Sequence, residues 1–360
     1  MGGDEETGRA AGSSSSASWR AVRLVVEVAT IALAIHLIWP RLAGFERVGR
    51  AFARGSWTSI AVLVAFEAAS LIAYGELVRA VLRSMGQPAS VSLVQRTTLV
   101  GTSLGRTMPG GTTTALAVVV GALRRAGFDG VRSTAALATS GLLSSFVLAL
   151  MLVPAVGIAV AGGQDGGIAL GAAIAALAVV IATVAVVPAA RNPTGAGDLV
   201  ERGLRRIIPR SLWNRVDPVV IARAVAHGVE GVQALVRDPR ALRRGLAFAA
   251  ANWLLDVAAL TAVAVTVGRG TPLSAILLTY VIGQLAAAIP LTPGGVGIVE
   301  TAMIGSFVAA GTPVGAATAT VLGWRLFSYW LPVLAGLGFL PTLPRRPLDD
   351  EPPAPGRATA

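Results

Sequence analysis

The sequence predicts an all-α, polytopic membrane protein, built as an inverted repeat with about six full spans and two re-entrant broken helices. Hydrophobic residues make up 54% of the chain, whereas charged residues make up 14%, against about 25% in soluble domains. Several apolar runs exceed the roughly 18 residues that mark a membrane span. Two other apolar stretches are interrupted by Pro-Gly-Gly, which a continuous helix does not tolerate.

Segments of low hydrophobicity at the two ends predict disordered tails, at residues 1–18 and 344–360. Between them we expect one transmembrane domain, at 19–340. An amphipathic helix at the membrane interface is predicted at 40–56, where arginines alternate with apolar residues. The long apolar runs predict full spans at 22–39, 58–83, 133–160, 168–189, 241–267 and 314–340.

The two interrupted stretches, 91–126 and 275–310, predict helical hairpins. As helices, the arms of the first would be about 24 and 20 Å long, which is less than the hydrocarbon core of about 30 Å. Each hairpin is therefore expected to enter and leave the membrane on the same side.

The two Pro-Gly-Gly breaks also indicate an internal duplication. Pro109 and Pro293 stand 184 residues apart. We expect one repeat at 58–147 and another at 242–331, joined by an arginine-rich cytoplasmic linker at 190–240. Further pairs recur at the same offset: Gly86 and Gly270, Pro88 and Pro272, Gly121 and Gly305, and Gly127 and Gly311.

Arginines are distributed unevenly between the predicted loops. They concentrate in alternate loops, whereas the turns at 161–167 and 268–272 contain only Arg269. By the positive-inside rule, this predicts a multi-pass protein of the cell membrane with both termini in the cytoplasm. Counting the spans then gives the two repeats opposite orientations.

Composition limits the chemistry and the partners that can be expected. The chain has no cysteine and two well-separated histidines, which argues against a thiol or histidine metal site. No hydrolase, metalloprotease or nucleotide-binding signature is found, so we expect no catalytic residue, no cofactor and no enzyme activity. The net charge is +11, and every basic residue is an arginine. Two explanations of this arginine-rich composition stay open: a GC-rich genome combined with the positive-inside rule, or attraction to anionic lipids. Binding to nucleic acid is not expected.

Inverted repeats place a substrate site near the middle of the membrane, where the two hairpin tips face each other. Free amides at the start of each second arm attract anions, and arginine suits phosphate. Buried ionisable residues in a membrane are functional candidates. The predicted substrate-binding residues are Arg106, Pro109, Gly110, Gly111, Thr112, Thr113, Asp256, Pro293, Gly294, Gly295, Gly297, Glu300, Arg325 and Tyr329.

Structural roles compete with these assignments. Arg325, Glu300 and Asp256 could form an internal ion pair that only fixes helix packing. Glu67 and Glu76, in the span at 58–83, are expected to reach headgroups or pair with loop arginines. The aromatic residues near Tyr329 are expected to pack or to form an interfacial belt.

The segment Pro293-Gly-Gly-Val-Gly-Ile-Val-Glu300, followed by Arg325–Tyr329, resembles the transmembrane region of lysylphosphatidylglycerol synthase. This resemblance covers about residues 20–340 and implies a lipid flippase fold. Relatives carry a fused synthase or glycosyltransferase domain; none follows here, so synthase activity is not expected. In the first copy of the motif, Thr113 replaces the third glycine and Leu116 the glutamate.

The sequence therefore predicts a translocase for a polar or phosphate-bearing membrane lipid, with anionic or phosphate-bearing lipids as its partners. One alternative is a non-transporting subunit that anchors a separate cytoplasmic glycosyltransferase or lipid-modifying enzyme through the 190–240 linker. Another is an intramembrane lipid-modifying enzyme, which the absence of a nucleophile–base or metal constellation disfavours.

Overall fold

The computed structural model describes residues 57–108, 111–162, 231–267, 270–287 and 292–344, with short pieces at 170, 177, 201–203 and 205–206. Its regular elements in these residues are all helical, which confirms the predicted all-α class. They are α3 (Trp57–Ser84), α4 (Val91–Thr107), α5 (Gly111–Arg125), α6 (Gly130–Ala161), α10 (Pro239–Val267), α11 (Leu273–Ala287), η3 (Pro293–Gly295), α12 (Ile298–Ala309), α13 (Val314–Arg325), η4 (Leu326–Trp330), α14 (Leu331–Phe339) and η5 (Leu340–Thr342).

Several predicted segments lie outside the described residues. They include Pro109 and Gly110 of the first tip, and Arg269 of the predicted outer turn. The others are the tail at 1–18, the spans at 22–39 and 168–189, the interfacial helix at 40–56, most of the linker at 190–240 and nearly all of the tail at 344–360.

Three described helices are long and apolar enough to cross a membrane, and they coincide with three of the predicted spans. These helices are Ile60–Ser84, Gly130–Ile158 and Pro239–Val267. The predicted span at 314–340 is instead formed by α13, η4 and α14 in succession. The π-helical turn η4 interrupts it just before Pro332, which cannot donate a backbone hydrogen bond.

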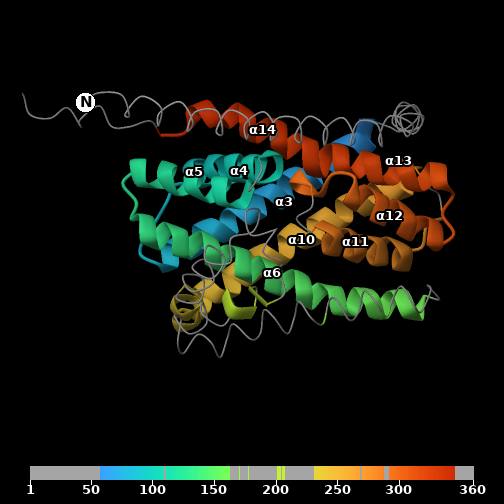
Figure 1. Ribbon diagram of the computed structural model, residues 1–360, viewed down its shortest axis with the longest axis horizontal. Helices are drawn as coiled ribbons and strands as arrows, with labels where there is room; N and C mark the ends of the chain where they lie inside the picture. The colour runs from blue at the N-terminus through green and yellow to red at the C-terminus, as the bar shows by residue number, and fades with distance from the viewer. Residues whose placement is uncertain are drawn as a thin grey trace, which may run out of the picture.

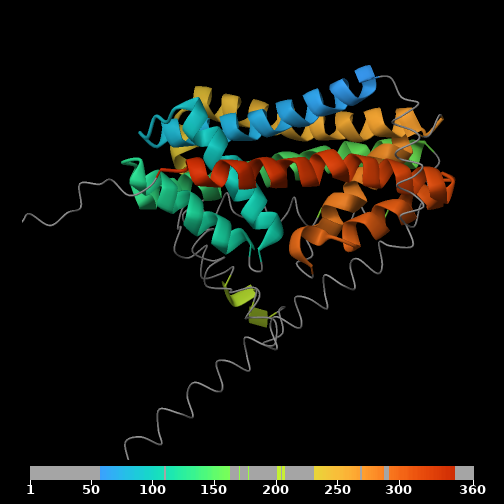
Figure 2. The ribbon, with the colours of Figure 1, turned by 90° about the horizontal axis from the view of Figure 1, so that it is seen from above.

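The two interrupted stretches form pairs of short helices, as predicted. Helix α4 packs against α5, and α11 packs against α12. The first pair is closed by Gly111, where a methyl group would collide with the backbone carbonyl of Gly105. In Figure 1 the pairs lie at opposite ends of the molecule, and in Figure 2 they converge toward its centre. There α4 contacts η3, so the tips of the two hairpins meet.

Helices α3 and α10 pack side by side; they cross the middle of the molecule in Figure 1 and lie along its upper edge in Figure 2. A polar clamp links them. The Asn252 amide donates to the Ser70 backbone carbonyl at 3.1 Å and to its hydroxyl at 2.8 Å, while that hydroxyl is 3.0 Å from the Asn252 carbonyl. Around this pair, α4 packs against α14, and α11 packs against α6.

Four turns among the described residues use glycine in the left-handed conformation. Gly86 and Gly270, which follow α3 and α10, have φ of 75° and 99°. Gly127 and Gly311, which follow α5 and α12, have φ of 88° and 84°. Side chains disfavour this conformation, so glycine is favoured at each of these four positions.

Candidate functional site

Tyr329 lies where the two hairpin tips meet. Its hydroxyl donates a 3.0 Å hydrogen bond to the backbone carbonyl of Arg106, near the end of α4. Its ring also lies against Gly294 of the second tip, where a methyl group would collide with the phenol. The Gly294 backbone has φ of 61°, a conformation that favours glycine. One side chain therefore contacts both tips.

Two arginines flank the ring of Tyr329. The guanidinium carbon of Arg325 lies 4.3 Å from the ring centre, and that of Arg106 lies 5.4 Å from it. Both distances are within the range of cation–π attraction. The aromatic face thus helps to hold two positive charges in the interior of the bundle.

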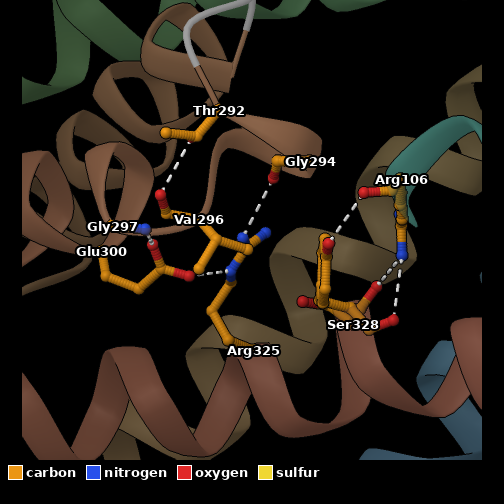
Figure 3. A network of polar contacts seen from close by, with 9 residues as sticks. Arg106, Thr292, Gly294, Val296, Gly297, Glu300, Arg325 and Ser328 are labelled. Atoms are coloured by element: carbon orange, nitrogen blue, oxygen red, sulfur yellow. Dashed lines mark hydrogen bonds and ion pairs between the residues drawn. The ribbon is translucent and has the colours of Figure 1, made fainter. Parts of the chain in front are cut away.

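Arg325 and Glu300 form the buried ion pair that the sequence offered as an alternative to substrate binding. Nε of Arg325 donates to Oε1 of Glu300 at 2.6 Å, and Nη2 donates to the Gly294 carbonyl at 3.2 Å. The second Glu300 oxygen accepts from the Gly297 amide at 2.6 Å, as Figure 3 shows. The start of α12 is therefore already occupied by a carboxylate of its own first turn.

Arg106 binds backbone carbonyls instead. Its Nη1 donates to the Ser328 carbonyl at 2.6 Å and to the Tyr329 carbonyl at 3.4 Å (Figure 3). In a regular helix the Ser328 carbonyl would accept from the residue four positions later, but that residue is Pro332. The Leu331 amide donates to the Leu326 carbonyl and so closes the π-helical turn. This turn exposes the same edge of the helix, on which the Ser328 carbonyl lies.

The charge of Arg106 is not balanced by an ion pair within the described part of the chain. The side chain is half-buried, and in the same part of the chain only its Nη1 finds acceptors. Guanidinium groups bind phosphate through two parallel hydrogen bonds. Arg106 therefore has the charge and the unused donors to bind a phosphate, whereas Arg325 is committed to Glu300.

Asp256 lies in a different environment from the one predicted for it. Its carboxylate accepts from the Tyr280 hydroxyl at 2.8 Å and from the Trp324 indole at 3.1 Å. It is not part of the Glu300–Arg325 pair. The carboxyl group of Glu67 lies beside it.

The prediction that Glu67 reaches the headgroups is wrong, because the residue is only 3% exposed between the packed helices. The prediction that Glu76 pairs with an arginine is confirmed by a 2.8 Å hydrogen bond from Arg79. Both acidic residues lie on α3, and the sequence pattern alone does not distinguish their environments.

The structure brings together six of the predicted binding residues around Tyr329: Arg106, Gly294, Gly297, Glu300, Arg325 and Tyr329 itself. Gly295 is buried at the second tip, and Thr292 closes that tip by donating to the Val296 carbonyl at 2.9 Å. Thr113 is exposed, while the side chains of Thr112 and Pro293 lie outside the description.

Sequence reasoning missed Ser328, Pro332 and Glu67. Ser328 binds through its backbone, so its side chain carries no signal. A proline four residues later does carry one, because it frees that carbonyl within an apolar span. In the part of the chain that the structure describes, no cluster of three acidic, histidine or cysteine residues could hold a metal ion.

Comparison with known proteins supplies the family. The family model of the lysylphosphatidylglycerol synthase TM region matches residues 24–336. Three proteins of Methanothermobacter thermautotrophicus, each described as a UPF0104 membrane protein, are also similar. Their identities to the chain are 30% over 108 residues, 31% over 88 and 24% over 120.

These alignments cover 30%, 24% and 33% of the chain and 31%, 26% and 36% of the respective relatives. The chain thus matches about a third or less of the length of each relative, and the relatives' names describe them only as membrane proteins. The family model, by contrast, spans most of the chain. The protein is therefore a multi-pass membrane protein that belongs to the lysylphosphatidylglycerol synthase TM-region family.

Proposed function

We propose that this protein moves a phosphate-bearing lipid across the cell membrane, its headgroup passing between the hairpin tips while the acyl chains remain in the bilayer. The observation that carries the proposal is the pair of arginines flanking Tyr329 where the tips meet. Arginines inside a membrane are costly and are associated with substrate pathways. No chemical step is required, and the proposal assigns no catalytic residue.

The lengths of the hairpin arms support a re-entrant arrangement. Helices α4 and α5 contain 17 and 15 residues, and α11 and α12 contain 15 and 12. At 1.5 Å per residue, they are about 18 to 26 Å long, which is short of a hydrocarbon core of about 30 Å. Broken helices that end inside the membrane are common at the substrate sites of transporters.

Packing supports two inverted copies of one unit, α3–α6 and α10–α14. The first hairpin packs on the last helix of the second unit, and the second hairpin packs on the last helix of the first. The left-handed glycines Gly86 and Gly127 recur as Gly270 and Gly311 at the 184-residue offset. With cytoplasmic termini, as the arginine distribution favours, the tips would approach each other from opposite sides of the membrane.

The hydrogen bonds suggest how the site would work. In this conformation Tyr329 bridges the tips, and Arg106 rests on the carbonyls of Ser328 and Tyr329. A phosphate would compete with these neutral acceptors, and a charge-assisted hydrogen bond is about twice as strong as a neutral one. Arg106 would move to the headgroup and release one tip, while the Glu300–Arg325 pair would keep the second tip in place.

Leaflet exchange in proteoliposomes tests this proposal. Tail-labelled phosphatidylglycerol, phosphatidylcholine and diacylglycerol would be compared, with a membrane-impermeant quencher reporting the outer-leaflet fraction. We expect exchange above that of protein-free liposomes for one or both phospholipids and none for diacylglycerol, which lacks phosphate. Background rates for all three lipids with folded protein would contradict the proposal, as would equal acceleration of diacylglycerol.

A further inference from the structure

Two buried carboxyl groups face each other across the central helix pair, next to the headgroup site. Glu67 of α3 lies beside Asp256 of α10, close enough to form a hydrogen bond once either group carries a proton. Oε1 of Glu67 is fully buried and has no hydrogen-bond partner among the described residues. A buried carboxyl oxygen without a donor is costly, so this arrangement needs a further ligand.

The local charges show what is missing. Within the part of the chain that the structure describes, three acidic residues surround the site, Glu67, Asp256 and Glu300, and two arginines, Arg106 and Arg325, lie among them. Fully ionised, the group would carry a net charge of −1 in a low-dielectric interior, where uncompensated charge is strongly disfavoured. A single proton neutralises it and supplies the missing donor.

We propose that Glu67 and Asp256 hold one exchangeable proton between them, and that this proton accompanies the lipid headgroup during translocation. The second half of this statement rests on the proposed function, whereas the first does not. The pair connects the two halves of the molecule, since Glu67 belongs to α3 and Asp256 to α10.

Hydrogen bonding distinguishes the two carboxyl groups. Asp256 accepts from Tyr280 of α11 and from Trp324 of α13, which favours its ionised form. Among the described residues, no comparable donor reaches Glu67, so the proton resides on Glu67, whose O–H donates a hydrogen bond to Asp256. On release, the O–H bond of Glu67 breaks, the proton passes to water, and two carboxylates remain in contact.

Arg106 connects the proton to the headgroup. Its positive charge lies within electrostatic range of both Glu67 and Asp256 and favours their ionised forms. A phosphate bound to Arg106 would neutralise that charge, so the pair would retain its proton. Proton and anionic headgroup would therefore bind together, and each would raise the affinity for the other.

Among the residues that the structure describes, the other polar groups nearby do not supply another counter-charge. On α13, Arg325 is paired with Glu300 of α12, and the charges of both lie within electrostatic range of Tyr329 of η4. On α11, Gln284 is a neutral partner of Tyr280. Within the described part of the chain, the negative charge of the carboxyl pair is therefore balanced by Arg106 and by the proton.

Infrared difference spectroscopy tests the proton site without any transport. Spectra of the purified protein would be recorded between acidic and alkaline pH, for the wild type, Glu67→Gln, Asp256→Asn and the control Glu76→Gln. We expect a protonated-carboxyl C=O band in the wild type and in Glu76→Gln, and loss of that band in the other two variants. Size-exclusion profiles would establish that each variant is folded.

Two results would overturn the assignment of a proton. One is a carboxyl band that persists unchanged in Glu67→Gln. The other is a thermal midpoint of the wild type that rises with sodium concentration and stops doing so in Glu67→Gln, because a metal cation would then neutralise the pair.

Transport under an imposed pH gradient tests the coupling. Phosphatidylglycerol should leave the leaflet facing the acidic side several times faster than the leaflet facing the alkaline side, and Glu67→Gln should abolish this difference. If phosphatidylglycerol left both leaflets at the same rate under the pH gradient, the coupling would be refuted but the proposed function would stand. If no lipid is exchanged at all, the proposed function fails, while the infrared band still decides the proton site.

Discussion

The hydroxyl of Tyr329 donates a 3.0 Å hydrogen bond to the backbone carbonyl of Arg106, a residue 223 positions earlier in the chain. This bond joins the second half of the molecule to the tip of the first hairpin. A neutral hydrogen bond contributes about 0.5–1.5 kcal/mol, which is enough to hold the tips together and small enough to break in a transport cycle. The contact can therefore hold the tips together reversibly, and we call it the tip latch.

Removing the Tyr329 hydroxyl while keeping the ring should weaken the tip latch, the contact between Tyr329 and the Arg106 carbonyl. We expect Tyr329→Phe to increase the rate of leaflet exchange by up to about tenfold, since the closed conformation loses one hydrogen bond. Tyr74→Phe is the matched control, because the Tyr74 phenol makes no hydrogen bond to the described residues. Equal rates for wild type and Tyr329→Phe would show that opening of this contact does not limit exchange.

Gly294 is expected to be irreplaceable at the second tip. In Gly294→Ala, the added methyl group would collide with the Tyr329 phenol, and the φ of 61° would strain the backbone by about 1–3 kcal/mol. Gly305 lies within α12 with no atom near its position for a Cβ, so Gly305→Ala should be neutral or stabilising by up to about 1 kcal/mol. Thermal unfolding in detergent measures both, and equal midpoints would contradict the assigned contact.

The Glu300–Arg325 pair should contribute to stability rather than to substrate binding. Glu300→Ala leaves a buried guanidinium unpaired and should cost about 3–5 kcal/mol in the free energy of unfolding. Glu300→Leu combined with Arg325→Met should recover much of that loss, because it leaves no buried charge. Glu201→Ala, which removes an exposed pair with Arg205, should cost no more than about 1 kcal/mol. If the losses in unfolding free energy of Glu300→Leu and Arg325→Met, measured singly, added up to the loss in the double variant, the two residues would not be coupled.

Pro332 leaves the Ser328 carbonyl available to Arg106. Pro332→Ala restores a backbone amide that can donate to this carbonyl and compete with the guanidinium. We expect the thermal midpoint to be unchanged or higher and leaflet exchange to fall several-fold, because the π-helical turn would become a regular helix. A lower midpoint with unchanged exchange would show that Pro332 serves packing instead.

Features that depend on local sequence could be predicted. Apolar runs predicted the spans formed by α3, α6 and α10, and the Pro-Gly-Gly breaks predicted both hairpins. The glycine pairs noted at the 184-residue offset, Gly86 with Gly270 and Gly127 with Gly311, have positive φ in the structure, a conformation that only glycine adopts freely. Each of these features is encoded within a few residues.

Features that depend on tertiary packing could not be predicted. Glu67 and Glu76 lie on the same helix, yet one is buried beside Asp256 and the other pairs with Arg79. The distinction arises from the face that packs against α10, which periodicity in an all-apolar helix does not reveal. Likewise, Pro332 marks the Ser328 carbonyl as free, but its partner Arg106 lies 222 positions away in the chain and could not be identified from local sequence.

The most direct test of the proposed function compares two arginines on the same helix. Arg106 and Arg96 both lie on α4, but Arg96 donates a 3.2 Å hydrogen bond to the Thr342 carbonyl of η5, whereas Arg106 bonds the carbonyls of Ser328 and Tyr329. If Arg106 binds the headgroup phosphate, Arg106→Gln should slow phosphatidylglycerol exchange by at least about tenfold, as expected from losing a charge-assisted bond of about 1.5–3 kcal/mol. Arg96→Gln should remain within about twofold of the wild type. Equal exchange rates in the two variants would contradict a headgroup site at the hairpin tips.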